Sequence, residues 1–132
     1  MYSDKHILVA DDDDDDLFLV KSALEDSGFN GKTNYVSNGI ELLDFLNKDT
    51  TEKPTLVLLD LNMPKKDGRE ALIELRQNPA LDDLTIIIFT TSNSPDDIQK
   101  CYVNGANCYI SKPNSFDELV EVLGKIMNFW GK

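Results

Sequence analysis

Residues 56–60 read Leu-Val-Leu-Leu-Asp, four apolar side chains that end at a single acidic one, Asp60. An unbroken apolar run of this length is typical of a strand buried on both faces, as in a parallel sheet, because a strand with one wet face alternates polar and apolar residues. Functional residues in such sheets gather at the carboxyl ends of the strands. The stretch therefore predicts a buried parallel strand with Asp60 at its functional end.

The same pattern recurs along the chain. Further short apolar runs occur at residues 7–10 and 86–89, a weaker one occurs at 108–110, and residues 33–36 are a fifth candidate. The segments between them are predicted helices. Three have apolar residues at helical spacing: residues 14–27 before Gly28, a segment with Ile40, Leu43 and Leu46, and one with Ala71, Leu72 and Leu75. The last two have helix-start signals: Ser94 as a cap before Pro95, and Ser115 with Glu118 at capping-box spacing, followed by Leu119. Strict alternation of strands and helices predicts an α/β, doubly wound five-stranded parallel sheet with helices on both faces.

Composition narrows the class of protein. The chain has 132 residues and a hydrophobic content of 41%, which favours one packed domain over residues 1–132. Its formal net charge is −11, which argues against binding nucleic acid or an anionic membrane, since both need clustered Lys and Arg. The first apolar run is too short for a signal peptide or a membrane span, so we expect a cytoplasmic protein. Cys101 and Cys108 lack CxxC spacing, and two reduced thiols are favoured over a disulfide.

Polar residues also follow the other predicted strands. Asp11 and Asp12 follow the first strand, Thr90 ends the fourth, and Lys112 follows the fifth, all at the same edge as Asp60. Carboxylates brought together repel one another unless a cation lies between them, and Mg²⁺ prefers oxygen ligands, with water and phosphate oxygens among them. The pattern predicts metal-assisted phosphoryl transfer in which Asp60 is the nucleophile. Lys112 and Thr90 are the residue types that contact phosphate oxygens.

Four segments, ILVADDD, LVLLDLNMPKKDG, IIIFTTS and GANCYISKP, stand in an order and spacing that resemble the receiver domain of two-component response regulators, over about residues 5–130. The resemblance implies a flavodoxin-like (βα)5 fold with strand order 2-1-3-4-5. It also implies that Asp60 accepts a phosphoryl group from a sensor histidine kinase, with Mg²⁺ as the cofactor. The phosphorylated protein would then bind a downstream protein target or pass the group to a phosphotransfer protein. Such a regulator is a signalling phosphoprotein and not an enzyme.

The resemblance implies a role for each residue of the site. Asp60 is the phosphoacceptor and a metal ligand. Asp12 matches a direct metal ligand and Asp11 a ligand that acts through water. Asn62 matches the position whose backbone carbonyl binds the metal. Thr90 matches the switch hydroxyl, which moves toward the phosphate.

The remaining matches concern the fifth strand and the loops. Tyr109 matches the aromatic residue of the switch, which turns inward after phosphorylation. Lys112 matches the lysine of the family, and the Lys112–Pro113 bond is implied to be cis. Thr91 is larger than the residue that the family often has there. Ser92, like Asn62, occupies a position that influences how water reaches the phosphoryl group, so the phosphate lifetime stays open.

Three further segments are similar to small single-domain regulators, including those paired with phytochrome-like kinases. They are NKDTTEKPT before the third strand, TTS after the fourth, and NFW near the C-terminus. The chain ends soon after the fifth helix, so we expect a stand-alone receiver. Some relatives dimerise through the last strand and helix, and a homodimer is a further expectation from the resemblance.

Two functions from other classes compete with this interpretation. A phosphatase-type hydrolase with an aspartyl nucleophile usually has a second acid two residues later, where this chain has Asn62, and it then lacks an evident general acid. A phosphorylation-independent binding module on the same fold is disfavoured by the intact acidic pair, Asp60, Thr90 and Lys112. The residues alone do not exclude that module.

Three placements complete the predictions. Residues 13–16 are expected to cap and begin the first helix, where negative charge suits the helix dipole, because a Ca²⁺ loop needs spaced acids, a Gly and a distant Glu. His6 lies at the opposite end of the first strand from Asp11, and we expect it on the surface or at an edge. Phe129 and Trp130 are expected to seal the last helix.

Overall fold

The structure of the protein is a computed structural model, which describes residues 5–48 and 53–130. The predicted strands and helices are all present in alternation. The strands are β1 (His6–Ala10), β2 (Lys32–Val36), β3 (Leu56–Leu59), β4 (Thr85–Thr90) and β5 (Cys108–Ser111). The helices are α1 (Asp14–Asp26), α2 (Gly39–Asn47), α3 (Gly68–Arg76), α4 (Pro95–Val103) and α5 (Phe116–Trp130), with a short 3-10 turn at Pro79–Leu81.

The five strands form one parallel sheet in the order β2-β1-β3-β4-β5, as the resemblance implied. Ala10, the last residue of β1, pairs with Leu59, the last residue of β3. Thr90, the last residue of β4, pairs with Ser111, the last residue of β5. Residues that follow these strands therefore start from the same edge of the sheet, which is the edge that carries the candidate site.

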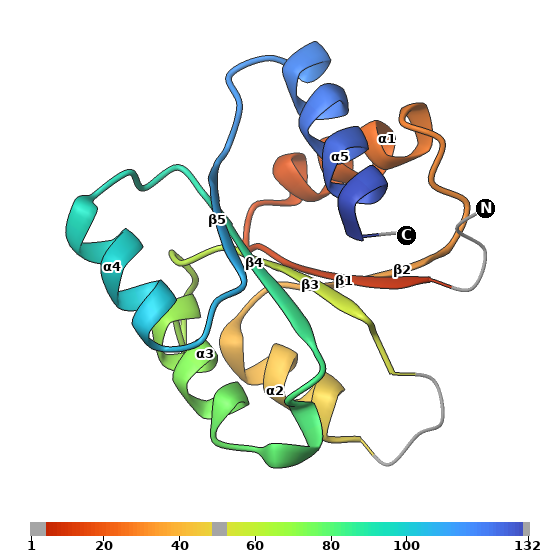
Figure 1. The fold of residues 1–132 in the computed structure, drawn as a ribbon. Coiled ribbons are helices and arrows are strands. Elements are labelled where there is room, and N and C mark those ends of the chain that lie inside the picture. Colours follow the sequence, from red (N-terminus) through yellow and green to blue (C-terminus); the bar gives the residue numbers. More distant parts are fainter. Residues whose placement is uncertain (1–4, 49–52, 131–132) are drawn as a thin grey trace.

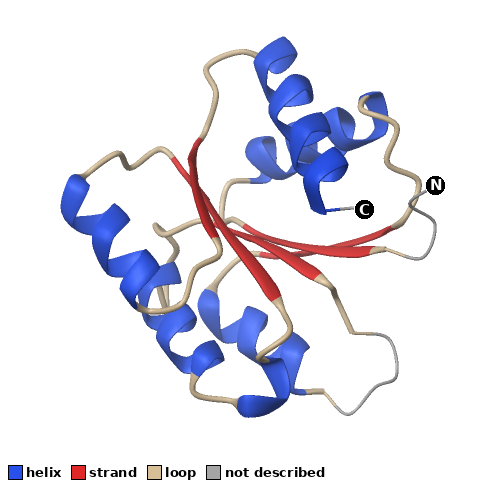
Figure 2. Cartoon of the chain, in the orientation of Figure 1, coloured by secondary structure: helices blue, strands red, loops and turns tan. Residues whose placement is uncertain are grey.

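Helices cover both faces of the sheet (Figures 1 and 2). Helices α1 and α5 lie side by side on one face, and α2, α3 and α4 lie on the other (Figure 1). Because side chains alternate along a strand, β1 contributes Ile7 and Val9 to the α1/α5 side and Leu8 and Ala10 to the other side. The apolar runs of the sequence thus fill two cores, and β1, β3 and β4 are the strands buried on both faces.

Helix starts follow the predicted caps. The Asp13 carboxylate accepts hydrogen bonds from the backbone N–H groups of Asp15 and Asp16, at 2.9 and 3.4 Å, and begins α1. Ser94 caps α4, with Pro95 at its first position. The Ser115 hydroxyl accepts the Glu118 N–H at 3.2 Å ahead of α5. The acidic run therefore continues as the first turn of a helix, as predicted.

The expectation for His6 was wrong. Its side chain is buried, with Nε2 2.6 Å from Asn34 Oδ1 and its ring edge-on to Phe45. The physical reason is that β1 lies between β2 and β3, so even its first residue is covered by neighbouring strands and by the α2 side of the sheet. A side chain at the end of an interior strand can therefore be buried from solvent.

The two aromatic residues near the end of α5 behave differently from each other. Trp130 is half-buried against the α1/α5 core, with Lys5 Nζ 5.5 Å from its ring. Phe129 is 90% exposed, so the expectation that it seals the helix was wrong. The two residues are neighbours on a helix, about 100° apart around its axis, and only one of them can face the core.

Two simpler expectations can be compared with the described residues. Neither Cys101 nor Cys108 forms a disulfide, as predicted. Within residues 5–48 and 53–130, no helix has both the length and the apolar character needed to cross a membrane.

Candidate functional site

Asp11 is held inward at the end of β1 by its own backbone and side chain. Its N–H donates to the Val36 carbonyl at 3.0 Å, which extends the β1–β2 ladder by one residue. Its carboxylate accepts the Asp13 N–H at 3.0 Å and is almost fully buried. Asp12, the next residue, is exposed. The two carboxylates of the acidic pair therefore reach the site from different depths.

Asp60 is fixed at the end of β3. Its N–H donates to the Ala10 carbonyl at 3.0 Å, and its side chain is buried beside β1. The chain folds back so tightly that a Cβ on Gly68 would lie 2.1 Å from the Asp60 carbonyl oxygen. The Asn62 N–H contacts Asp60 Oδ1 at 3.3 Å, and the Asn62 side chain is exposed. Only a glycine at position 68 permits this close return of the loop.

The carboxylates of Asp11, Asp12 and Asp60 converge, with one oxygen from each lying within 4.8 Å of the other two. Two oxygens bound to one Mg²⁺ at its usual bond length are at most about 4.2 Å apart, so small side-chain movements bring all three within reach of one ion. All three donors are oxygens, which suits a hard divalent cation. The residues present therefore fit the metal that the sequence predicted.

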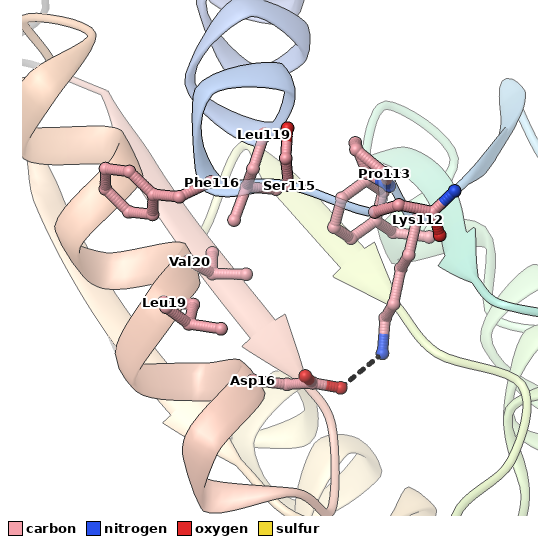
Figure 3. Close-up of a pocket in the computed structure, with 10 residues that line it drawn as sticks. Asp16, Leu19, Val20, Lys112, Pro113, Ser115, Phe116 and Leu119 are labelled. Atoms are coloured by element: carbon pink, nitrogen blue, oxygen red, sulfur yellow. Dashed lines mark hydrogen bonds and ion pairs between the residues drawn. The ribbon is translucent and has the colours of Figure 1, made fainter.

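Lys112 reaches the same carboxylates from the end of β5. Its Nζ is 2.6 Å from Asp11 Oδ2 and 3.0 Å from both Asp60 Oδ2 and Asp16 Oδ2. Figure 3 shows the side chain extending from the β5–α5 connection toward Asp16 on α1. Burial alone would lower the pKa of Lys112, but hydrogen bonds to Asp11 and Asp60 and their negative charge raise it above its ordinary value. Lys112 is therefore a permanent cation within the acidic cluster.

The pKa of Asp11 is raised, mainly because burial disfavours its charged form, and the nearby Asp60 charge adds to this effect. Its hydrogen bonds with Lys112 and the Asp13 N–H act in the opposite direction. The carboxylates of the cluster therefore repel one another, and a nearby cation is needed to balance their negative charge.

Thr90 and Tyr109 meet at Ser92, in the loop between β4 and α4. Thr90 is fully buried at the end of β4, and its Oγ1 lies 3.4 Å from the Ser92 N–H. Tyr109 is half-buried, and its hydroxyl donates to the Ser92 carbonyl at 2.8 Å. The structure therefore connects the two predicted switch residues through a third residue, which the sequence had singled out only for water access.

Two ionic contacts of the site were not predicted. Asp16, assigned only to the first turn of α1, also binds Lys112. Arg69 on α3 forms a bidentate pair with Asp97 on α4, at 2.8 Å for both contacts. The first joins the start of α1 to the residue after β5, a contact that no spacing along the chain indicates. No local pattern marks the second, because its partners belong to different helices.

The Lys112–Pro113 bond differs from the expectation. The described residues contain no cis peptide bond, so this bond is trans and the implied cis bond was wrong. The two isomers of an X-Pro bond differ by only about 0.5–1 kcal/mol, and the residue types alone do not decide between them.

Comparison with known proteins identifies the family. The sequence-family model of the response regulator receiver domain matches residues 7–124 of this chain. The chain belongs to this family. Receivers accept a phosphoryl group from histidine kinases in two-component systems, and this receiver is a phosphoacceptor response regulator.

Several relatives resemble this receiver over nearly its whole length. Rcp1 from Synechocystis sp. is 35% identical over 130 residues, covering 96% of this chain and 88% of Rcp1. The Mn²⁺-bound structure of Rcp1 matches with a TM-score of 0.86, covering 96% of this chain and 94% of that one. The phosphorylated cyanobacterial phytochrome response regulator RcpA matches at 35% identity with a TM-score of 0.88, covering 96% and 93% of the two chains. A response regulator of red light signalling in R. palustris, RPA3017, matches at 32% identity with a TM-score of 0.88 and the same coverage.

Proposed function

We propose that Asp60 is the phosphoryl acceptor of this receiver and that Asp11, Asp12, Asp60 and the Asn62 carbonyl hold Mg²⁺. The observation that carries the proposal is the convergence of three carboxylates within 4.8 Å, with Lys112 Nζ 3.0 Å from Asp60. A buried carboxylate with a lysine beside it and oxygen ligands around it has what an aspartyl nucleophile needs. The similar regulator Rcp1 has a Mn²⁺-bound form, which supports binding of a divalent ion by this receiver.

The transfer proceeds from a phosphohistidine of the kinase. An Asp60 carboxylate oxygen attacks phosphorus, the phosphorus–nitrogen bond breaks, and the imidazole leaves with the electron pair of that bond and takes a proton from solvent. Asp11, Asp12, Asp60 and the Asn62 carbonyl would hold Mg²⁺, which would supply positive charge to balance the transferred oxygens. Lys112 donates to a phosphoryl oxygen in place of one of its present carboxylate partners, and it keeps its charge because its pKa is raised.

Thr90 and Tyr109 form the switch in this proposal. Thr90 lies at the end of β4, beside β3 and Asp60, and its hydroxyl is free to turn toward a phosphoryl oxygen once the weak 3.4 Å contact with Ser92 is released. Ser92 also carries the hydrogen bond to the Tyr109 hydroxyl. A movement of Thr90 therefore reaches β5 and the neighbouring surface of α4, where a downstream protein target or a phosphotransfer protein would bind.

The kinase has to approach from the open side of the acidic cluster. Two apolar side chains of α1, Phe18 and Leu19, are 68% and 42% exposed. Leu19 lines a small cavity of about 120 Å³ together with Lys112 and Pro113 (Figure 3). Exposed apolar side chains beside a reactive group favour a protein-docking surface. We assign this surface to the histidine kinase, and the likeness to phytochrome response regulators favours a phytochrome-like one.

A second copy of the chain is the proposed partner at the β5 edge. An apolar groove of about 730 Å³ runs along β5 and α5 and is bordered by Ile110, Ile126 and the exposed Phe129. An open sheet edge beside apolar side chains is a surface that soluble proteins usually cover. The cytoplasmic location and the single-domain organisation over residues 1–132 remain predictions, as does the lack of nucleic-acid and membrane partners.

The test is the intact mass of the purified protein after addition of a small phosphodonor, with and without Mg²⁺. We expect one phosphoryl adduct that depends on Mg²⁺ and is absent from Asp60→Asn. Asp44→Asn, which changes an acid on α2 in the same way, is the matched control and keeps the adduct. A folded parent protein that forms no adduct would contradict the proposal and favour the phosphorylation-independent binding module. An adduct on Asp60→Asn would place the acceptor elsewhere.

A further inference from the structure

Arg69 on α3 contacts side chains of the loop after β3 and of α4. Its Nε and Nη2 donate to the two carboxylate oxygens of Asp97 at 2.8 Å each, and its Nη1 is 3.5 Å from Asn62 Oδ1. Asp67 lies 3.6 Å from Nη1 as well. Paired, parallel hydrogen bonds between Arg and a carboxylate combine strength with a defined geometry. Arg69 therefore joins the loop after β3 to α4.

Asp97 in turn connects Arg69 to Ser92, in the loop after β4. The Ser92 hydroxyl donates to Asp97 Oδ2 at 2.8 Å, while the Ser92 N–H contacts Thr90 and its carbonyl accepts the Tyr109 hydroxyl. Every polar group of Ser92 is thus engaged. We call Arg69, Asp97 and Ser92 the brace, because together they connect α3, α4 and the β4–α4 loop.

The brace is a principal attachment of α4. Cys101 is the one buried residue of this helix in the described part of the chain, so apolar packing holds α4 only weakly. The Arg69 and Asp97 side chains are 37% and 16% exposed, whereas the ion pair between Asp96 and Lys100 on the same helix has side chains that are 70% and 69% exposed. Exposed ion pairs of the second kind contribute little, while a partly buried bidentate pair has a more defined geometry.

The geometry relates the brace to hydrolysis of the phosphoryl group. Loss of the group requires a water oxygen to attack phosphorus in line with the Asp60 oxygen–phosphorus bond, which then breaks. The products are the free Asp60 carboxylate and inorganic phosphate, which carries the added water oxygen. Such a water comes from the solvent side, where Asn62 and Ser92 follow β3 and β4. Arg69 contacts the first of these side chains, and Asp97 binds the second.

We infer that the brace restricts access of water to phosphorylated Asp60, with Arg69 and Asp97 as positioning residues that set the phosphate lifetime. The inference rests on the proposed role of Asp60. Breaking the Arg69–Asp97 pair releases Asn62 and Ser92 together and widens the approach for water. Hydrolysis then accelerates, although neither Arg69 nor Asp97 takes part in the bond changes.

The experiment measures the half-life of the adduct by intact mass after the small phosphodonor is removed, at constant Mg²⁺. Asp97→Asn and Arg69→Gln are each expected to shorten it by roughly three- to tenfold. The double variant is expected to match the single variants, because one brace is broken only once, whereas unrelated structural damage at two positions multiplies. Asp96→Asn, which breaks the exposed pair on the same helix, is the matched control and stays within about twofold of the parent.

Ser92→Ala removes the last link of the brace and leaves the ion pair intact, so it serves if either charge variant fails to fold. It is expected to shorten the half-life as well, and Arg69→Gln added to it is expected to have less effect than it has in the parent. Unchanged or longer half-lives in Asp97→Asn and Arg69→Gln would overturn the inference, as would multiplicative effects in the double variant. These results leave the proposed function standing, because the parent adduct still forms. A parent without an adduct would overturn both.

Discussion

At the scale of single residues, Lys112 is where the charges of the site are balanced. Its ammonium group contacts Asp11, Asp16 and Asp60, and its side chain is only 12% exposed. A buried carboxylate that loses its partner is costly, and here two of the three carboxylates are largely sheltered from water. The same group that is expected to contact the phosphoryl group therefore also keeps the unphosphorylated site stable.

We predict that Lys112→Ala lowers the free energy of unfolding by about 3 kcal/mol when no divalent ion is present. Added Mg²⁺ should recover part of that loss, because a cation that binds only the folded carboxylate cluster stabilises the protein. The measurement is urea unfolding with and without Mg²⁺. Lys100→Ala, which removes an exposed lysine paired with Asp96, is the control and should change stability by less than about 0.5 kcal/mol. A Lys112→Ala protein as stable as the parent without Mg²⁺ would show that Lys112 does not balance the cluster.

Asp97 gives a prediction for pH. The hydrogen bonds from Arg69 and then from Ser92 lower the pKa of Asp97 to about 2. Because the pKa is lower in the folded state than in the unfolded chain, the pair stabilises the fold fully above the unfolded value, about 3.9, and this contribution is lost as the pH falls toward the folded value. The difference in urea midpoint between the parent and Asp97→Asn should therefore be constant from about pH 7 to pH 5 and shrink below about pH 4. A difference that already shrinks near neutral pH would contradict the assignment.

At the scale of elements, the loop from β3 to α3 is anchored by its two ends. Gly68 begins α3, and its N–H donates to the Leu61 carbonyl at 2.9 Å. On the other side, the Lys66 carbonyl accepts the Gly39 N–H at 2.8 Å, which ties the loop to the start of α2. The loop that carries Asn62 is thus held between two helix starts, and the position of Asp60 depends on both.

Two glycines are predicted to respond in opposite ways to alanine. Gly68→Ala places a Cβ 2.1 Å from the Asp60 carbonyl oxygen, a backbone atom that cannot move without displacing Asp60, and should lower the free energy of unfolding by about 3 kcal/mol. Gly124→Ala on α5 meets only Ser27 Cβ at 3.8 Å and should raise it by about 0.5–1 kcal/mol, since alanine favours helix more than glycine does. Urea unfolding measures both. Equal stability of parent and Gly68→Ala would mean that the loop has room that the structure does not show.

Most elements could be predicted because their signals are local. Strands β1, β3 and β4 are apolar runs, and the caps at Asp13 and Ser94 stand directly before their helices. The site could be predicted for the same reason, since Asp60 and Lys112 directly follow strands. The contact between Arg69 and Asp97 could not, because it depends on how closely α3 and α4 approach, and nothing in either helix encodes that distance.

Other misses have a similar origin. Burial of His6 follows from the strands on both sides of β1, and a strand order is a property of the sheet and not of one strand. Exposure of Phe129 depends on the rotation of α5 at its last turn. The Asp16–Lys112 contact joins the first helix to the end of the last strand. In each case the residue type was compatible with several placements, and the packing of distant elements selected one.

At the scale of the whole molecule, the parts of the sheet surface differ in what covers them. Both faces are covered by helices, and the carboxyl edge carries the acidic cluster (Figure 1). The side of the sheet that ends at β5 is an open strand edge next to α5. The formal net charge of −11 keeps copies of the chain apart in solution, so an association between them needs a surface of low charge.

The β5–α5 groove is such a surface. Its lining includes Ile87, Ile110, Val122 and Ile126, with Lys125 as its one charged side chain, and Phe129 at its border is 90% exposed. An aromatic side chain so exposed beside a groove of about 730 Å³ gains apolar contact when a second copy covers it.

We predict that the parent sediments as a dimer at micromolar concentrations and that Phe129→Asp shifts it to monomer. Val103→Asp, on an apolar residue of α4 that is 77% exposed, should leave the dimer intact. Sedimentation velocity decides the matter: a parent that stays monomeric would reject the interface, and loss of the dimer only in Val103→Asp would move it to α4.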